Sequence, residues 1–168
     1  AVCHNYQPRA MDVVTAVLIP DLPPEETIHM KPFKGFKELA KKVGIKYQEG
    51  EVLKLDKCIY GLKQASKRWN DDITSALIKQ GYSQSNFDKC LFYRKESGPN
   101  GELLLLGLHV DDCIMAGPTH MVEELVKFLN KTFPMKDLGE ATVFTGIQIH
   151  KVYNGIVLNQ SVFTLKLL

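Results

Sequence analysis

The sequence predicts an α+β fold in which helices cover one face of an antiparallel sheet. Segments of strand type and helix type follow one another in a mixed order that ends in a hairpin. Residues 102–110 form a run that is apolar on both faces, which is typical of a buried strand. From Lys63 to Gln80, apolar residues recur every three or four positions, which predicts an amphipathic helix.

The composition is that of a globular protein. The chain has 168 residues, of which 45% are hydrophobic and 24% charged, and this excludes disordered and collagen-like classes. A net charge of +2 does not by itself indicate a nucleic-acid partner. The sequence has neither an apolar run that could span a bilayer nor a signal-peptide pattern. The cysteines match no zinc pattern and are predicted to be free thiols in a reducing compartment: Cys3, Cys58, Cys90 and Cys113.

The first half of the chain is predicted to hold two strands and two helices. Residues 11–18 are β-branched and apolar, with Asp12 their one carboxylate, and they predict a strand that ends at a turn over residues 19–21. Residues 20–33 are proline-rich and predicted to be irregular. The remaining predictions are a short helix over 33–42, a half-buried strand over 51–55, and the helix over 63–80, which Gly81 ends.

The second half is predicted to contain a hairpin with two carboxylates at its tip. Residues 102–110 and 113–116 are its two arms, and Asp111 and Asp112 separate them. Other predicted elements are strands over 89–95, 142–151 and 156–158, a turn over 98–101, a helix with Thr119 as its N-cap, and a helix from residue 161. There is no internal repeat or linker, so we expect one domain.

Two adjacent carboxylates inside an apolar hairpin need an explanation. Asp111 and Asp112 repel each other, and their placement costs free energy unless a positive group neutralises them. The alternative is a solvated turn, where aspartate is common for local reasons. Asp12 also lies in an apolar strand, and a neighbouring position would bring it beside the hairpin tip. Three oxygen donors at one sheet edge suit Mg²⁺, and two such ions catalyse phosphoryl or nucleotidyl transfer.

Six sequence blocks resemble the reverse transcriptases of Ty1/copia retrotransposons, in the family's order. Residues 11–16 (MDVVTA) are similar to motif A, QMDVKTAFLNG, and residues 59–70 (IYGLKQASKRWN) to LYGLKQASRQW. Residues 109–112 (HVDD) stand where the family has YVDD. Residues 133–139 (FPMKDLG) and 146–149 (GIQI) resemble FxMKDLG and LGIxI, and residues 158–160 (LNQ) resemble LSQ. Because the blocks cover residues 11 to 160 in order, the resemblance is specific, and it argues against an unrelated metal-dependent phosphotransferase.

The resemblance implies a polymerase palm with a metal-binding triad. Asp12 and Asp111 would each ligate two Mg²⁺ ions, or Mn²⁺, and Asp112 would be more peripheral. The partners would be an RNA or DNA template with its primer and a dNTP. Lys136 would be a general acid for the leaving pyrophosphate, and the alternative is an ordinary exposed lysine.

The block around residue 64 implies further contacts to substrate. Gln64 matches a position near the incoming base and template. Lys63 and Arg68, with Lys67, form a basic helix start that would contact phosphates, and the alternative is a solvated helix face. Trp69 is predicted to pack in the core.

Three departures from the family pattern bear on activity. Val17 stands where the family has a bulky aromatic residue that excludes the ribonucleotide 2′-hydroxyl, so exclusion of ribonucleotides is expected to be poor. Residues 19–20 (Ile-Pro) replace Asn-Gly, and proline cannot adopt the positive φ of glycine. His109 replaces tyrosine, which makes the charge at this position pH-dependent.

By this resemblance, residues 1–168 would be a partial reverse transcriptase domain, running from motif A to the start of the thumb. The fingers, most of the thumb and ribonuclease H would be missing, and the chain would normally belong to a larger Pol polyprotein in cytoplasmic particles, without a membrane. Two hypotheses follow: an RNA-directed DNA polymerase palm that is active within a longer chain, or a catalytically inactive retroelement remnant that binds nucleic acid weakly.

Overall fold

The structure is a computed structural model that describes residues 6–97, 101–153 and 155–167. It confirms a mixed α+β fold with antiparallel sheets and four α-helices among the described residues. The chain divides into two compact units, residues 1–16 with 70–168 and residues 17–69. Each unit is described by itself.

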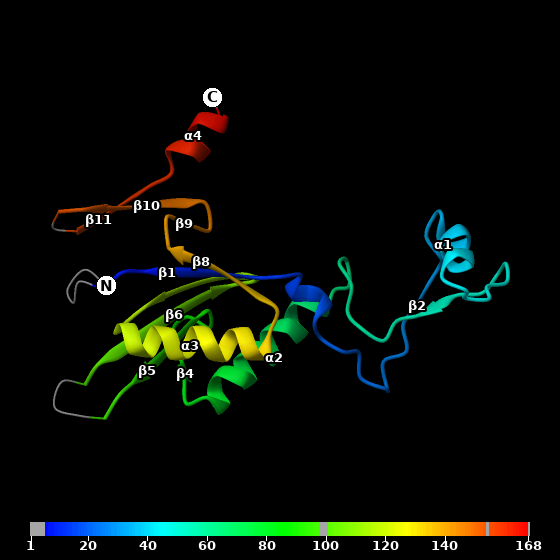
Figure 1. The fold of residues 1–168 in the computed structure, drawn as a ribbon, viewed down its shortest axis with the longest axis horizontal. Helices are drawn as coiled ribbons and strands as arrows, with labels where there is room; N and C mark the ends of the chain where they lie inside the picture. The colour runs from blue at the N-terminus through cyan, green and yellow to red at the C-terminus, as the bar shows by residue number, and fades with distance from the viewer. Residues whose placement is uncertain (1–5, 98–100, 154, 168) are drawn as a thin grey trace. The chain divides into compact units, whose positions relative to one another are not determined.

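The first unit contains a six-stranded antiparallel sheet (Figure 1). The strand order is β4-β5-β6-β7-β1-β8, so β1, the first strand in sequence, is inserted between β7 and β8. The strands are β1 (Arg9–Val13), β4 (Ser83–Gln84), β5 (Leu91–Lys95), β6 (Leu103–His109), β7 (Asp112–Ala116) and β8 (Met135–Glu140).

The core lies between one face of this sheet and two helices, α2 (Ala65–Lys79) and α3 (Thr119–Thr132) (Figure 1). Alternate residues of β6 are buried, as expected for a strand with one covered face: Leu104, Leu106 and Leu108. The helices bury side chains at helical spacing: Ile73 and Leu77 from α2, and Met121, Leu125 and Leu129 from α3. A Cβ on Gly117 would lie 2.9 Å from the Cα of Leu104, so this turn requires glycine.

The opposite face of the sheet carries the polar row described below and a small three-stranded sheet. This smaller sheet has the order β11-β10-β9, with β9 (Val143–Phe144), β10 (Ile147–Val152) and β11 (Gly155–Asn159). The ring of Phe144 lies about 4.0 Å from the position that a Cβ on Gly107 would take, so β9 contacts β6 where it has no side chain. The described chain ends with α4 (Ser161–Leu167), which has no buried residue.

The second unit is small. It has a two-stranded sheet of β2 (His29–Met30) and β3 (Leu53–Lys54) and the helix α1 (Phe36–Lys42). A 3-10 helix over Ala16–Leu18 begins at the last residue before this unit and continues into it. Its apolar cluster consists of Val17, Cys58 and Ala65, with Leu18, Leu22 and Leu62 packed against it.

Several predicted boundaries were wrong. The strand predicted over 11–18 ends at Val13, because Thr15 adopts a positive φ of 56° and the chain then turns into the 3-10 helix. Thr119 is the first helical residue and not the N-cap; Pro118 holds the cap position in an extended conformation. The strand predicted over 142–151 is two strands, separated by Thr145 and Gly146, both of which have positive φ.

The helix predicted over 63–80 is confirmed as α2, and Gly81 with φ of 86° follows it. The short helix, the strands near residues 51–55, 89–95 and 156–158, and the last helix are also present with shifted ends. Strand β8 was not predicted. The turn predicted at residues 98–101 falls mainly outside the described residues, as does Cys3.

Candidate active site

Four polar residues lie side by side across the central strands of the sheet. In the antiparallel register His109 of β6 is opposite Asp112 of β7, Asp112 is opposite Asp12 of β1, and Asp12 is opposite Lys136 of β8. Residues that are directly opposite in an antiparallel pair point to the same face. The four side chains therefore form one row, which we call the acidic row. It lies on the face away from Leu108, Cys113 and Met11, which are buried.

The tip of the hairpin adds a third carboxylate. The strands β6 and β7 are joined by a two-residue turn of Val110 and Asp111. The prediction that both carboxylates lie at the tip is therefore wrong for Asp112, which is the first residue of β7. The backbone N–H of Val13 donates a hydrogen bond of 2.8 Å to the carbonyl of Asp111, which ties β1 to the turn. Val110 has a φ of 55°, a conformation that β-branched residues rarely adopt.

The carboxylates influence one another. Partial burial raises the pKa of Asp112 above its ordinary value, and the negative charges of Asp111 and Asp12 raise it further, whereas His109 lowers it. Beneath the row, burial and the same carboxylates raise the pKa of Cys113 to about 12. The row is thus a region of excess negative charge that favours a cation.

The donor set fits Mg²⁺ in its chemistry, because carboxylate oxygens are the ligands that hard divalent cations prefer. The oxygens of Asp12, Asp111 and Asp112 are not among the described groups whose ligand atoms all lie within 4.8 Å of one another.

An ion pair next to the row was not anticipated from the sequence. Arg9 of β1 binds Asp137 of β8, with Nε of Arg9 3.0 Å from Oδ1 of Asp137 and a second, shorter contact between their other polar atoms. This pairing holds the pKa of Asp137 below its ordinary value. No local pattern marks β8: residues 135–138 (Met-Lys-Asp-Leu) do not alternate between apolar and polar residues, and two of them are charged.

The second unit holds the other predicted site residues. The side chains of Gln64 and Arg68 both contact Glu26: the Gln64 amide nitrogen donates to Oε2 at 3.3 Å, and Arg68 forms an ion pair with Oε1. Lys63 is exposed. Val17 is buried in the apolar cluster with Cys58 and Ala65. Trp69, the last residue of the second unit, is buried, as predicted.

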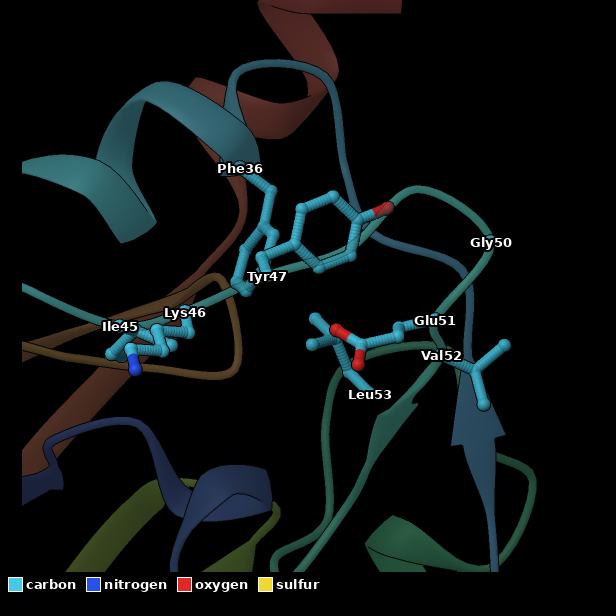
Figure 2. A pocket seen from close by; sticks show the side chains of 8 residues that line it. All are labelled: Phe36, Ile45, Lys46, Tyr47, Gly50, Glu51, Val52 and Leu53. Carbon is cyan, nitrogen blue, oxygen red and sulfur yellow. The ribbon is translucent and has the colours of Figure 1, made fainter.

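A shallow pocket of about 430 Å³ also lies in the second unit (Figure 2). The rings of Phe36 and Tyr47 meet edge to face at 5.2 Å on one side of it, and Lys46 and Glu51 supply its charges. None of the residues predicted for the active site lines this pocket.

Comparison with known proteins identifies the family of this chain. The family model described as reverse transcriptase (RNA-dependent DNA polymerase) matches residues 1–168. The Pol polyprotein of transposon TNT 1-94 from Nicotiana tabacum is 37% identical over 140 residues, which is 83% of this chain and 10% of that protein. A putative transposon Ty5-1 protein from Saccharomyces cerevisiae is 34% identical over 147 residues, covering 86% of this chain and 44% of that protein.

A third relative, the Pol polyprotein of transposon RE2 from Arabidopsis thaliana, is 29% identical over 169 residues, or 11% of its length. These matches define the class of protein, which is the reverse transcriptases. This chain belongs to that family, and its relatives are Pol polyproteins of the Ty1/copia type. It spans less than half the length of these relatives. No solved structure matches significantly. In the described part of the chain, no helix is both long and apolar enough to cross a membrane.

Proposed function

We propose that this chain is the palm of an RNA-directed DNA polymerase, which transfers a deoxynucleotide from a dNTP to the 3′-hydroxyl of a primer paired with an RNA or DNA template. The single observation that supports this best is the acidic row together with Asp111: Asp12 and Asp112 are directly opposite on neighbouring strands, and Asp111 directly precedes Asp112 at the turn. Segments about 100 residues apart in sequence supply these carboxylates.

Asp12, Asp111 and Asp112 would hold two Mg²⁺ ions, or Mn²⁺ in their place. When bound, such ions supply Lewis acidity that makes the primer hydroxyl a better nucleophile and neutralises the triphosphate. The protein contributes position and charge. The sheet fixes the spacing of Asp12 and Asp112, and the hydrogen bond from Val13 fixes the backbone of Asp111.

The two ends of the row would act on the substrate. Lys136, directly opposite Asp12 and exposed, would bind the phosphates and give a proton to the leaving pyrophosphate. His109, exposed at the other end, would contact the primer end as a hydrogen-bond donor. Gln64, Lys63 and Val17 belong to the second unit, and the resemblance alone implies that they too contact substrate. Arg68, whose guanidinium binds Glu26, would support that unit and would reach a phosphate only by leaving this partner.

Primer extension on an RNA template with Mg²⁺ tests the proposal. The purified chain and a longer version that includes the flanking Pol segments are compared, each with Asp111→Asn. The control is Asp71→Asn, which removes a carboxylate from the exposed face of α2. We expect Asp111→Asn to abolish extension, with a loss of at least about 10³-fold, and Asp71→Asn to leave it unchanged.

If only the longer version extends the primer, the palm can support catalysis but needs the flanking Pol segments. If neither version extends the primer, or if Asp111→Asn extends it as well as the parent protein, the proposal is wrong. The first of these results would favour the inactive remnant.

A further inference from the structure

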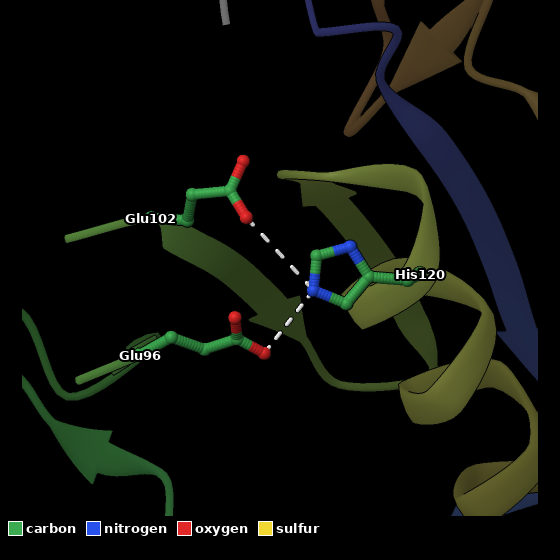
Figure 3. Close-up of side chains that lie close together, drawn as sticks. All are labelled: Glu96, Glu102 and His120. Atoms are coloured by element: carbon green, nitrogen blue, oxygen red, sulfur yellow. Dashed lines mark hydrogen bonds and ion pairs between the residues drawn. The ribbon is translucent and has the colours of Figure 1, made fainter. Parts of the chain in front are cut away.

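Three potential metal ligands converge at the opposite end of β6 from the acidic row (Figure 3). Glu96 follows β5 directly, Glu102 directly precedes β6, and His120 is the second residue of α3. The backbone N–H of Glu96 donates a 2.9 Å hydrogen bond to the carbonyl of Glu102. The hairpin therefore holds the two glutamates across from each other, and α3 places the imidazole between their carboxylates.

The distances between the donor atoms suit a small tetrahedral ion. Nε2 of His120 lies 3.1 Å from Oε1 of Glu96 and 3.9 Å from Oε2 of Glu102, and the three ligand atoms all lie within 4.8 Å of one another. Donors bound at about 2.1 Å in a tetrahedron lie about 3.4 Å apart. The two distances from the imidazole fall on either side of that value, so small side-chain rotations would bring all three donors to one ion.

The charges also favour an ion here. Like charges directly opposite across a strand pair repel each other. A protonated His120 would neutralise only one of the two carboxylates, whereas a divalent cation would neutralise both. The N-terminus of α3 opposes a cation, but its partial charge of about +0.5 is small against two full negative charges.

We propose that Glu96, Glu102 and His120 form a zinc site that clips the N-terminus of α3 to the β5–β6 hairpin. Zinc accepts both imidazole nitrogen and carboxylate oxygen as ligands, whereas Mg²⁺ prefers oxygen ligands alone. The side chains of Glu96, Glu102 and His120 are 42%, 44% and 59% exposed, so an ion has an open path and water can fill the fourth position. Six residues of β6, 103–108, separate Glu102 from His109, a distance of about 20 Å along the strand.

Calorimetric titration of the whole chain with Zn²⁺ alone, near neutral pH, tests the site. The reactive thiols, Cys90 among them, are alkylated beforehand, and Asp111→Asn is present to weaken any zinc binding by the acidic row. We expect one bound equivalent and a higher melting temperature with zinc. His120→Asn and Glu102→Gln should each weaken zinc binding by at least about tenfold and abolish the rise in melting temperature.

The matched control is His150→Asn, which removes an exposed imidazole from β10 and should bind zinc like the parent chain. His120 and Glu102 are themselves exposed, so their variants are expected to fold, which circular dichroism would verify. Absence of zinc binding by the parent chain, or unchanged affinity in His120→Asn, would overturn the proposal. These results do not depend on polymerase activity, since no step of the titration requires DNA synthesis.

Discussion

At the scale of single residues, the carboxylates of the candidate active site come together in two ways, through adjacency in the sequence and through strand pairing. Asp111 and Asp112 are adjacent in sequence but differ in role, because the two-residue turn takes Val110 and Asp111 and leaves Asp112 in the ladder with Asp12. The carboxylates could be predicted from the sequence because charged residues interrupt apolar strands. Their partners could not: Lys136 faces Asp12 only through the pairing of β1 with β8, a long-range contact without a local pattern.

For Val17 and Arg68 as well, the sequence does not reveal which side chains they contact. A family position predicts what a residue does in the relatives, whereas burial depends on the local packing of this chain. Val17 is buried in an apolar cluster, so an aromatic side chain there would also have to displace Cys58 or Ala65. The weak exclusion of ribonucleotides expected from this valine stays a prediction.

Val110 at the hairpin turn is predicted to store strain. Its φ of 55° is costly for a β-branched side chain, by about 1–3 kcal/mol, whereas glycine adopts it freely and loses about 0.5–1 kcal/mol through unfolded-state entropy. Val110→Gly should therefore raise the free energy of unfolding by about 1 kcal/mol, measured by urea denaturation.

The control for Val110 is Val14→Gly. Val14 is an equally exposed valine in a turn (46% against 47%), but its φ is not positive. It should lose stability on the same change. A loss of stability in both variants would show that Val110 is not strained.

At the scale of elements, helix α2 and the strands β5, β6 and β7 follow from patterns of apolar residues, and their predicted ends are wrong by only a few positions. The predictions fail where tertiary contacts decide. Strand β8 contains three charged residues and a glycine, yet β1 pairs with it from Met135 to Glu140, with one register shift between Ala10 and Met11. Met135–Glu140 is largely exposed, so its ladder hydrogen bonds, and not burial of an apolar face, define it as a strand.

An ion pair between two elements predicts a pH-dependent stability. Arg94 of β5 binds Glu124 of α3 through two hydrogen bonds of 2.9 and 2.6 Å. This holds the pKa of Glu124 below its ordinary value of 4.5. A carboxylate whose pKa is lowered by folding stabilises the protein above its ordinary pKa, and the effect is lost as pH falls through the lowered pKa.

Glu124→Gln should therefore cost about 0.5–1 kcal/mol at neutral pH, a small value because the glutamate is half exposed. The difference from the parent chain should shrink as pH falls below 4.5, measured by urea denaturation at several pH values. Glu123→Gln removes the same charge one position earlier and serves as the control. An equal loss in both variants, or a loss independent of pH, would contradict this assignment.

At the scale of the whole molecule, charge is unevenly distributed between the units. Residues 17–69 contain eleven Lys and Arg side chains against seven Asp and Glu, whereas the rest of the chain contains ten against twelve. Six exposed lysines lie between residues 31 and 46, close in sequence to the aromatic rings of Phe33, Phe36 and Tyr47. Positive charge with aromatic rings is the combination that binds single-stranded nucleic acid, and the net charge of +2 conceals it.

Replacement of two of these lysines should weaken RNA binding in a salt-dependent manner. Each phosphate contact to a single strand contributes about 0.7 to the slope of log affinity against log salt concentration. Lys41→Gln with Lys42→Gln should therefore lower that slope by about 1.4. Fluorescence anisotropy with a single-stranded RNA over a range of salt concentrations measures it.

Lys151→Gln with Lys166→Gln, two exposed lysines of the first unit, is the control. If the parent chain and the variant with Lys41→Gln and Lys42→Gln show the same slope of log affinity against log salt concentration, these two lysines do not contact the RNA phosphates.

The buried thiol of Cys113 has a practical consequence. A cysteine reacts as its thiolate, and with a pKa of about 12 Cys113 stays protonated at neutral pH. Cys58 is buried as well, whereas Cys90 is exposed just before β5. Among the described cysteines, a maleimide dye should therefore label Cys90 and spare the sheet beneath the aspartates. Fluorescence from that dye would report on nucleic-acid binding without any change to the residues proposed for catalysis.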